Sequence, residues 1–161
     1  MNKKRLPLIV GIVLLVALAF IGVASACDYG CSPGYWKNTD PNNWPAPLKP
    51  VMIIGGPIII IGDSGGTITY LQSVDLNGDG KLDSNIDALK YQGGSGSDGA
   101  RRILLRAAVA AAINEAAFGD AFPATTETAN AIGKAYISGD RKAMIDLAGQ
   151  LNSWNNIGCP L

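Results

Sequence analysis

Oxygen-bearing side chains recur at alternate positions of one short segment near the middle of the chain. The segment reads Asp75-Leu76-Asn77-Gly78-Asp79-Gly80-Lys81-Leu82-Asp83, which places carboxylates or an amide at positions 1, 3, 5 and 9 of a loop. Calcium takes about six to eight oxygen ligands, and alternate side chains of a tight loop can converge on one ion. Gly80 permits the sharp turn at position 6, and the backbone carbonyl of Lys81 would supply the ligand at position 7. The spacing therefore predicts a Ca2+ site.

The end of this loop departs from the EF-hand pattern, in which position 12 carries a bidentate Glu. Here position 12 is Ile86, and the carboxylate follows one residue later at Asp87. Either Asp87 reaches the ion through a shifted helix start, or the site lacks a bidentate ligand, as in the similar loops of thrombospondin-type and dockerin-like repeats. A single copy indicates a structural clamp, with Leu82 anchoring the loop to the core. The alternative is a turn built on Asn-Gly and Asp-Gly steps without a metal.

Four aromatic side chains are candidates for a ligand site of a different kind. They are Tyr35, Trp36, Trp44 and Trp154. A cluster of such rings can stack on sugars while neighbouring asparagines bind hydroxyl groups. Large rings also pack around irregular segments and disulfides. We favour packing, because Trp36 and Trp154 lie near the cysteines at the two ends of the expected domain.

The composition excludes the commonest catalytic centres. The chain has no histidine, so it cannot form a Ser-His-Asp triad, a Cys-His pair or an HExxH zinc site. Acid–base catalysis needs two converging carboxylates, and the acidic residues outside the loop follow no such spacing. Equal numbers of basic and acidic residues, 13 of each, argue against nucleic-acid binding. We therefore predict a protein that is not an enzyme, with a hydrolase as the remaining alternative.

Residues 1–26 have the organisation of a secretory signal peptide. A basic start precedes an almost unbroken apolar run from Leu6 to Ala24, which closes on an Ala-Ser-Ala sequence. One alternative is that this run is retained as an N-terminal membrane anchor. Another is a weak lipobox, in which Cys27 carries the lipid. Each interpretation places the rest of the chain outside the cytoplasm, so we expect a secreted, extracellular or cell-surface protein.

The three cysteines lie at the two ends of a single exported domain, residues 27–161. Removal of residues 1–26 takes three basic residues and no acidic one, so this domain is mildly acidic. Disulfides form in oxidising compartments, and the preferred pair is Cys31–Cys159. The pair Cys27–Cys159 is the alternative. One cysteine is left over in either case, and it is lipidated, free or paired with another chain.

The local patterns predict an α+β fold with three parts. Residues 27–50 form an irregular arm, because their prolines exclude a helix. Residues 51–71 form two or three short strands, because runs rich in isoleucine alternate with glycine turns. The remainder, residues 84–161, is helical: 84–91, a buried Ala-rich helix over 99–118, 126–137 and 141–151. The solvent-facing side of the long helix is marked by Arg101, Arg102, Arg106, Asn114 and Glu115.

Several motifs resemble those of a family of secreted bacterial and archaeal proteins without an assigned activity. Cys31-Ser32-Pro33-Gly34-Tyr35-Trp36-Lys37-Asn38 is similar to its CTPGYWKNH signature, with Thr39 in place of the usual His. The helix segment 105–114 and the C-terminal Asn155-Asn156-Ile157-Gly158-Cys159-Pro160-Leu161 are similar to two further motifs, RxAVAALLNA and NNxGCPL. The resemblance implies an exported domain with paired cysteines at its ends.

These features together predict a calcium-stabilised exported or cell-surface domain with a structural or adhesive role at the cell envelope. A carbohydrate- or protein-binding module that uses the aromatic arm is one alternative. A self-assembling filament subunit, in which residues 51–71 pair between chains, is the other. The expected partners are envelope components, glycans or further copies of the chain. We expect no nucleic acid, and a membrane only through the N-terminal segment.

Overall fold

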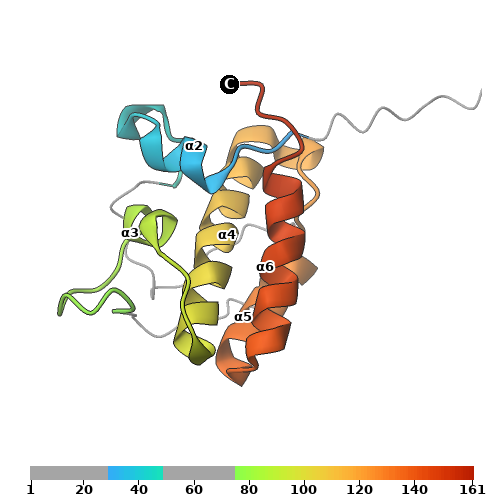
Figure 1. Ribbon diagram of the computed structural model, residues 1–161. Coiled ribbons are helices and arrows are strands. Elements are labelled where there is room, and N and C mark those ends of the chain that lie inside the picture. Colours follow the sequence, from blue (N-terminus) through green and yellow to red (C-terminus); the bar gives the residue numbers. More distant parts are fainter. Residues whose placement is uncertain (1–28, 49–74) are drawn as a thin grey trace, which may run out of the picture.

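The computed structural model describes residues 29–48 and 75–161 (Figure 1). Within these ranges the chain forms five α-helices and two 3-10 turns. In chain order they are α2 (Pro33–Asn38), η1 (Pro41–Asn43), α3 (Asn85–Lys90), α4 (Gly96–Phe118), η2 (Gly119–Ala121), α5 (Thr126–Ser138) and α6 (Arg141–Asn155). The long helix α4 lies between two groups of helices, with α5 and α6 on one side and α2 and α3 on the other.

Helices α4 and α6 lie side by side and run in the same direction. Arg141, at the start of α6, donates a hydrogen bond to the carbonyl of Gly96 at the start of α4, at 2.8 Å. Near the opposite ends of the two helices, Asn114 donates to the side-chain oxygen of Asn155 at 2.9 Å. Helix α5 returns antiparallel to both, as Figure 1 shows.

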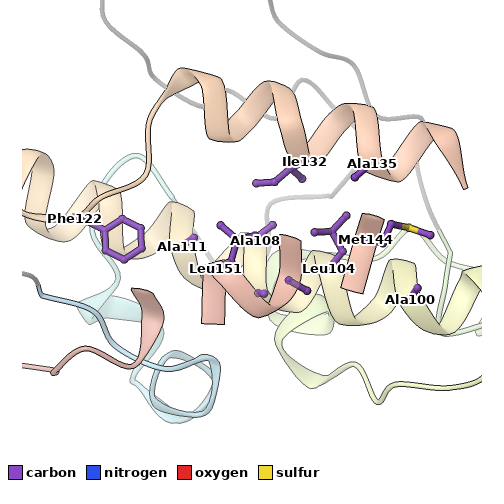
Figure 2. Packing of buried hydrophobic residues seen from close by; sticks show 11 residues of the cluster. Ala100, Leu104, Ala108, Ala111, Phe122, Ile132, Ala135, Met144 and Leu151 are labelled. Carbon is purple, nitrogen blue, oxygen red and sulfur yellow. The ribbon is translucent and has the colours of Figure 1, made fainter. Parts of the chain in front are cut away.

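The larger core fills the space between α4, α5 and α6. Figure 2 shows its buried side chains, which include Leu104, Ile132, Met144 and Leu151. Alanines on α4, such as Ala108, let the neighbouring helices approach closely. Burying one large aliphatic side chain stabilises a fold by about 1.5–3 kcal/mol, so this cluster dominates the packing of the helical part.

The opposite face of α4 is also apolar and covers a second core. Ile113 packs there with Trp36, Leu89 and Cys31. Leu105 packs nearby with Tyr91. Because α4 contacts helices on both sides, its sequence is apolar nearly all round, and the sequence correctly predicted a long buried helix at this place.

The predicted α+β class is wrong for the part of the chain that the structure describes. That part is helical and forms no β-sheet. Its two ends are joined by an isolated antiparallel bridge between Gly30 and Gly158. Residues 51–71, which the sequence assigned to strands, lie outside the described residues.

The N-terminal arm is also more regular than predicted. Helix α2 begins at Pro33, directly after Ser32, whose hydroxyl oxygen accepts a hydrogen bond from the backbone N–H of Tyr35 at 3.1 Å. Proline disrupts a helix only at interior positions. At the first helical position the backbone N–H has no partner within the helix, so its absence costs nothing there, and the φ that proline fixes is already helical. The prediction counted prolines and overlooked this Ser-Pro start.

The four helices from α3 to α6 lie where the sequence predicts them, with shifted ends. Asp140 caps α6, because its carboxylate accepts from the backbone N–H of Lys142 at 2.8 Å and of Ala143 at 3.2 Å. Helix α4 begins three residues earlier than expected, after Ser95. Across residues 29–48 and 75–161, no helix combines the length and the apolar character needed to span a membrane.

Candidate functional site

The predicted calcium loop is organised around the carboxylate of Asp75. One oxygen of this side chain accepts hydrogen bonds from the backbone N–H groups of Gly78 at 2.7 Å and Asp79 at 3.2 Å. The other oxygen accepts from Gly80 at 2.9 Å. The Asp75 side chain thus holds the backbone of Gly78, Asp79 and Gly80 around itself. The turn needs φ values of 78° at Gly78 and 79° at Gly80, which favour glycine.

The next two polar residues of the loop form turns of the same kind. The side-chain oxygen of Asn77 accepts from the backbone N–H of Asp79 at 2.9 Å, and a carboxylate oxygen of Asp79 accepts from Lys81 at 2.9 Å. Asn77 also donates to Asp79 through its side-chain amide at 3.3 Å. Asp and Asn favour such turns because their short side chains reach the backbone two residues ahead. The local sequence therefore gathers the polar side chains of positions 1, 3 and 5 in one exposed loop.

Asp83, at position 9, is the unusual member of the site. Its side chain is buried, with 1% of its surface exposed. The Oδ2 atom accepts hydrogen bonds from the backbone N–H of Leu76 and from the hydroxyl of Tyr91, the latter at 2.6 Å. The Oδ1 atom is buried and has no hydrogen-bond partner within the described ranges. An unsatisfied buried acceptor costs about 1–3 kcal/mol, and more when it is charged.

Tyr91 connects the loop to the helices. Its ring packs against Leu105 of α4, and its hydroxyl donates to Asp83. Burial raises the pKa of the Tyr91 hydroxyl, and the hydrogen bond to Asp83 raises it further. Tyr91 is therefore a permanent hydrogen-bond donor at ordinary pH, which orients the Asp83 carboxylate.

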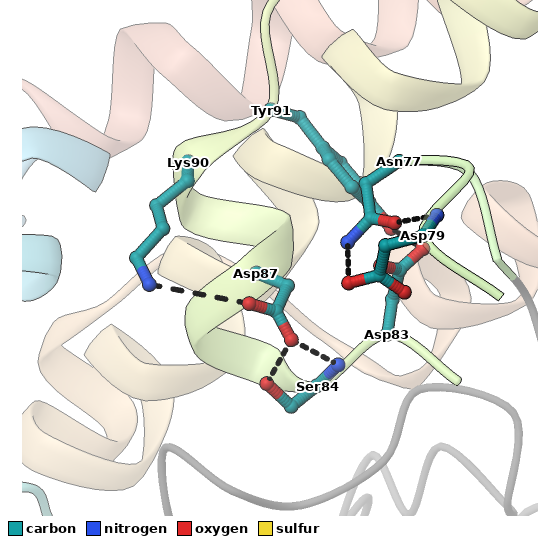
Figure 3. Close-up of polar contacts among 7 residues, drawn as sticks. All are labelled: Asn77, Asp79, Asp83, Ser84, Asp87, Lys90 and Tyr91. Carbon is teal, nitrogen blue, oxygen red and sulfur yellow. Dashed lines mark hydrogen bonds and ion pairs between the residues drawn. The ribbon is translucent and has the colours of Figure 1, made fainter. Parts of the chain in front are cut away.

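Asp87 does not join the other carboxylates. Figure 3 shows it on α3 with Ser84 and Lys90, apart from the group formed by Asn77, Asp79 and Asp83. It accepts from the backbone N–H of Ser84 at 3.0 Å and from the Ser84 hydroxyl, and it lies 4.0 Å from the Lys90 ammonium. Burial raises the pKa of Asp87, but the two hydrogen bonds and the Lys90 charge together lower it below its usual value. Asp87 is thus a cap of α3.

The loop has the right donor chemistry for a cation but is not a closed cage. No cluster of three acidic or cysteine side chains with the spacing of a metal site occurs in residues 29–48 and 75–161. Oxygen atoms are nonetheless the ligands that Ca2+ prefers, and Asp83 contributes a buried one that has no partner in the described part of the chain. The residues therefore fit Ca2+ by donor type. Leu82 was wrongly expected to anchor the loop, since 48% of its surface is exposed.

The aromatic residues of the arm pack inside the protein. Trp36 and Trp44 are buried, with ring centres 6.4 Å apart, and half-buried Tyr35 stands edge-on to Trp36 at 5.1 Å. Trp154 lies in the other core, edge-on to Phe122 at 6.5 Å. The structure thus separates Trp154 from the other three rings. Burial of both Trp36 and Trp44 favours packing over sugar stacking.

The structure contains the preferred disulfide, Cys31–Cys159. Beside it, Asn114 of α4 is fully buried, although the sequence placed it on the solvent side. The Asn114 oxygen accepts from the backbone N–H of Cys31 and from the indole N–H of Trp36, both at 2.9 Å. Its amide donates to the carbonyl of Cys31 and to Asn155, also at 2.9 Å. One polar residue in an otherwise apolar stretch of α4 was the signal for this position.

Comparisons with known proteins gave no match to any family model, curated protein or solved structure. The resemblance to secreted proteins with a CTPGYWKNH-type motif stays a prediction. Cys27, the candidate lipidated residue, and the apolar N-terminal run lie outside the described residues.

Proposed function

We propose that the protein is an exported structural domain at the cell envelope, stabilised by a disulfide at one end and by Ca2+ at the other. The observation that carries this proposal is the buried Oδ1 atom of Asp83, which has no partner in the described part of the chain. It belongs to a loop whose other polar side chains lie at the spacing of calcium ligands. A bound cation would satisfy this oxygen.

The side chains that would hold the ion are those of Asp75, Asn77, Asp79 and Asp83, together with the carbonyl of Lys81. When bound, Ca2+ neutralises the mutual repulsion of three carboxylates that lie within nine residues of each other. The chain itself supplies the turn, through Gly78 and Gly80, and the inward anchor, through the Tyr91 hydroxyl on Asp83.

An extracellular location agrees with both stabilising features. The Cys31–Cys159 disulfide belongs in an oxidising compartment. Calcium modules outside the cell bind with dissociation constants of about 10⁻⁴–10⁻³ M, and an open loop with one buried carboxylate suits this range better than a tight sensor site. The proposed role is therefore structural: the disulfide and the ion keep the domain folded in the extracellular medium.

Thermal unfolding with calcium and with a chelator tests this proposal. Binding to the folded state alone stabilises it by about 2.7 kcal/mol at a hundredfold excess over the dissociation constant, which corresponds to a rise of about 10 °C in the midpoint. We expect this rise in the native protein and its loss in Asp79→Asn. The matched control is Asp146→Asn, which removes the same charge from the exposed surface of α6. A midpoint that calcium leaves unchanged in the native protein would contradict the proposal.

The other roles that the sequence left open receive less support. A binding module built on the aromatic arm would need exposed rings, and both Trp36 and Trp44 are buried. Assembly through residues 51–71 concerns a segment outside the described residues. The structural role remains the one that described contacts favour.

A further inference from the structure

A polar groove lies beside the calcium loop, where α3 ends and α4 passes. It has a volume of about 290 Å³. The residues that line it are Asn77, Asp87, Lys90, Tyr91, Gln92 and Arg102. It joins the loop, through Asn77, to α4, the long helix that contacts both cores.

Arg102 is the charged residue of this groove whose side chain has no partner among the described residues. Its neighbour Arg101 pairs with Asp98 at 2.7 Å, and Arg106 donates to the carbonyl of Tyr91 at 3.2 Å. The side chain of Arg102 makes neither a hydrogen bond nor an ion pair with any described residue, whereas its Nε atom is buried without a partner like those of Arg101 and Arg106. A guanidinium pairs best with a planar oxyanion through two parallel hydrogen bonds. A half-buried Arg without such a partner therefore indicates a place for an anion.

The other residues that line the groove restrict which class of anion it can bind. Lys90 adds a second positive charge, and its nearest carboxylate, Asp87, is 4.0 Å away and already accepts two hydrogen bonds from Ser84. Asp87 and the loop carboxylates would repel a doubly charged phosphate. Two side-chain amides, of Asn77 and Gln92, offer donors and acceptors for neutral hydroxyl groups. The groove thus suits one carboxylate with hydroxyls beside it.

We propose that this groove binds an acidic sugar, with Arg102 and Lys90 on the carboxylate and with Asn77, Gln92 and Asp87 on the hydroxyl groups. The surface would hold uronic-acid residues of a polysaccharide, which gives the structural domain an adhesive role. The proposal rests on the proposed function in one respect. Asn77 belongs to both sites, so calcium, by ordering the loop, strengthens sugar binding.

Titration with D-galacturonic acid, with galactose as the neutral comparison, tests the groove. Calorimetry gives the affinity, and the NMR signal of the Arg102 Nε–H group reports contact directly. In calcium buffer we expect galacturonate to bind at least tenfold more tightly than galactose and to shift that signal. Arg102→Gln should lower the galacturonate affinity at least tenfold. Lys134→Gln, which removes a positive charge from the exposed surface of α5, should leave it unchanged.

Each of the other possible outcomes would contradict one part of this proposal. Equal binding of galactose and galacturonate, or an Arg102→Gln variant that binds normally, overturns the site. Inorganic phosphate that binds as tightly as galacturonate overturns the sugar in favour of a simple anion site. Binding of equal strength in chelator overturns the coupling through Asn77. The unfolding experiment with calcium uses no sugar, so its failure is distinguishable from a failure of the groove.

Discussion

Asn114 and Asp83 are two buried polar side chains whose hydrogen bonding differs. Asn114 has all four of its hydrogen-bonding positions filled, by Cys31, Trp36 and Asn155. Asp83 has one oxygen with two donors and one with none in the described ranges. The first centre is complete, whereas the second leaves one buried oxygen without a partner among residues 29–48 and 75–161.

The contrast shows two ways in which this helical domain accommodates a buried polar side chain. A neutral amide loses little on burial once its four partners are present. A buried carboxyl oxygen without a hydrogen-bond partner costs more than a satisfied amide, and pairing it or binding it to a metal removes that cost. The Asn114 end therefore needs no further partner, whereas under the proposed function the Asp83 end is completed by calcium from the medium.

The disulfide further stabilises the end of the protein that contains Asn114. It joins residues 128 positions apart, at the same end as Asn114. In the chain-entropy model a loop of this length contributes about 4–5 kcal/mol. Asn114 holds both the N–H and the carbonyl of Cys31, so the covalent bond and the amide fix the same segment against α4.

The largest effect is expected from Asn114→Ala. It leaves the Cys31 N–H, the Cys31 carbonyl and the Trp36 indole N–H without their partner in a buried site. Each unsatisfied buried group costs about 1–3 kcal/mol, so we expect a loss of about 3–5 kcal/mol in the free energy of unfolding. Urea unfolding measures it, and the loss should be the same with calcium and with chelator.

The control for this experiment is Asn156→Ala. Asn156 is exposed and bonds to the carbonyl of Asn152 within one turn, so its removal should cost about 0.5 kcal/mol or less. An Asn114→Ala variant as stable as this control would remove the basis of the comparison. A loss that appears only in chelator would show that the two ends are coupled rather than independent.

A smaller effect, with the opposite dependence on calcium, is expected from Tyr91→Phe. The substitution keeps the ring in the core and removes one donor from Asp83. A hydrogen bond to a charged group contributes about 1.5–3 kcal/mol. We expect a loss of this size in chelator and a smaller one in calcium, because the ion supports the same carboxylate. Chemical unfolding in both buffers gives the two values.

Tyr35→Phe is the matched control. The Tyr35 hydroxyl makes no hydrogen bond in the part of the chain that the structure describes, so its removal should change stability little in either buffer. If Tyr91→Phe behaved like Tyr35→Phe, the Asp83 carboxylate would not depend on its donors.

The sequence was sufficient for features that local chemistry determines. Asp140 after Ser138-Gly139 predicted the start of α6, and the apolar stretch of α4 predicted a helix buried on most sides. The alternation of Asp75, Asn77 and Asp79 predicted a tight polar loop, and the observed turns follow from the same side chains.

The features that the sequence did not reveal depend on which partner each polar side chain finds in the folded chain. Nothing beside Asn114 in the sequence indicates that Cys31, 83 positions earlier, returns to it. Asp83 belongs to the same loop pattern as the exposed Asp75, Asn77 and Asp79, and nothing in that pattern shows that it turns inward to the Tyr91 hydroxyl and the Leu76 backbone N–H. Asp87, one residue after position 12 of the loop pattern, was one candidate ligand, whereas in the structure it accepts hydrogen bonds from Ser84 and caps α3.

The smallest change in stability is expected from Asp87→Asn, which tests whether Asp87 belongs to the calcium loop or to α3. Its folded pKa is lowered, so the stability it contributes is complete above its unfolded pKa of about 4 and is lost as the pH falls through the folded value. Asp87→Asn should therefore be less stable than the native protein at pH 7, by about 1 kcal/mol or less, and the difference should vanish in acid. Unfolding between pH 2 and pH 7, in chelator, measures it.

Ser84→Ala tests the physical cause of this difference. It removes the hydroxyl donor and keeps the backbone N–H, so it should retain part of the acid dependence that Asp87→Asn loses completely. The calcium-induced rise in the unfolding midpoint should survive in Asp87→Asn, because the carboxylate serves α3 and not the ion. If this substitution abolished the rise as Asp79→Asn should, Asp87 would belong to the metal site, and the Asp83 end would extend into α3.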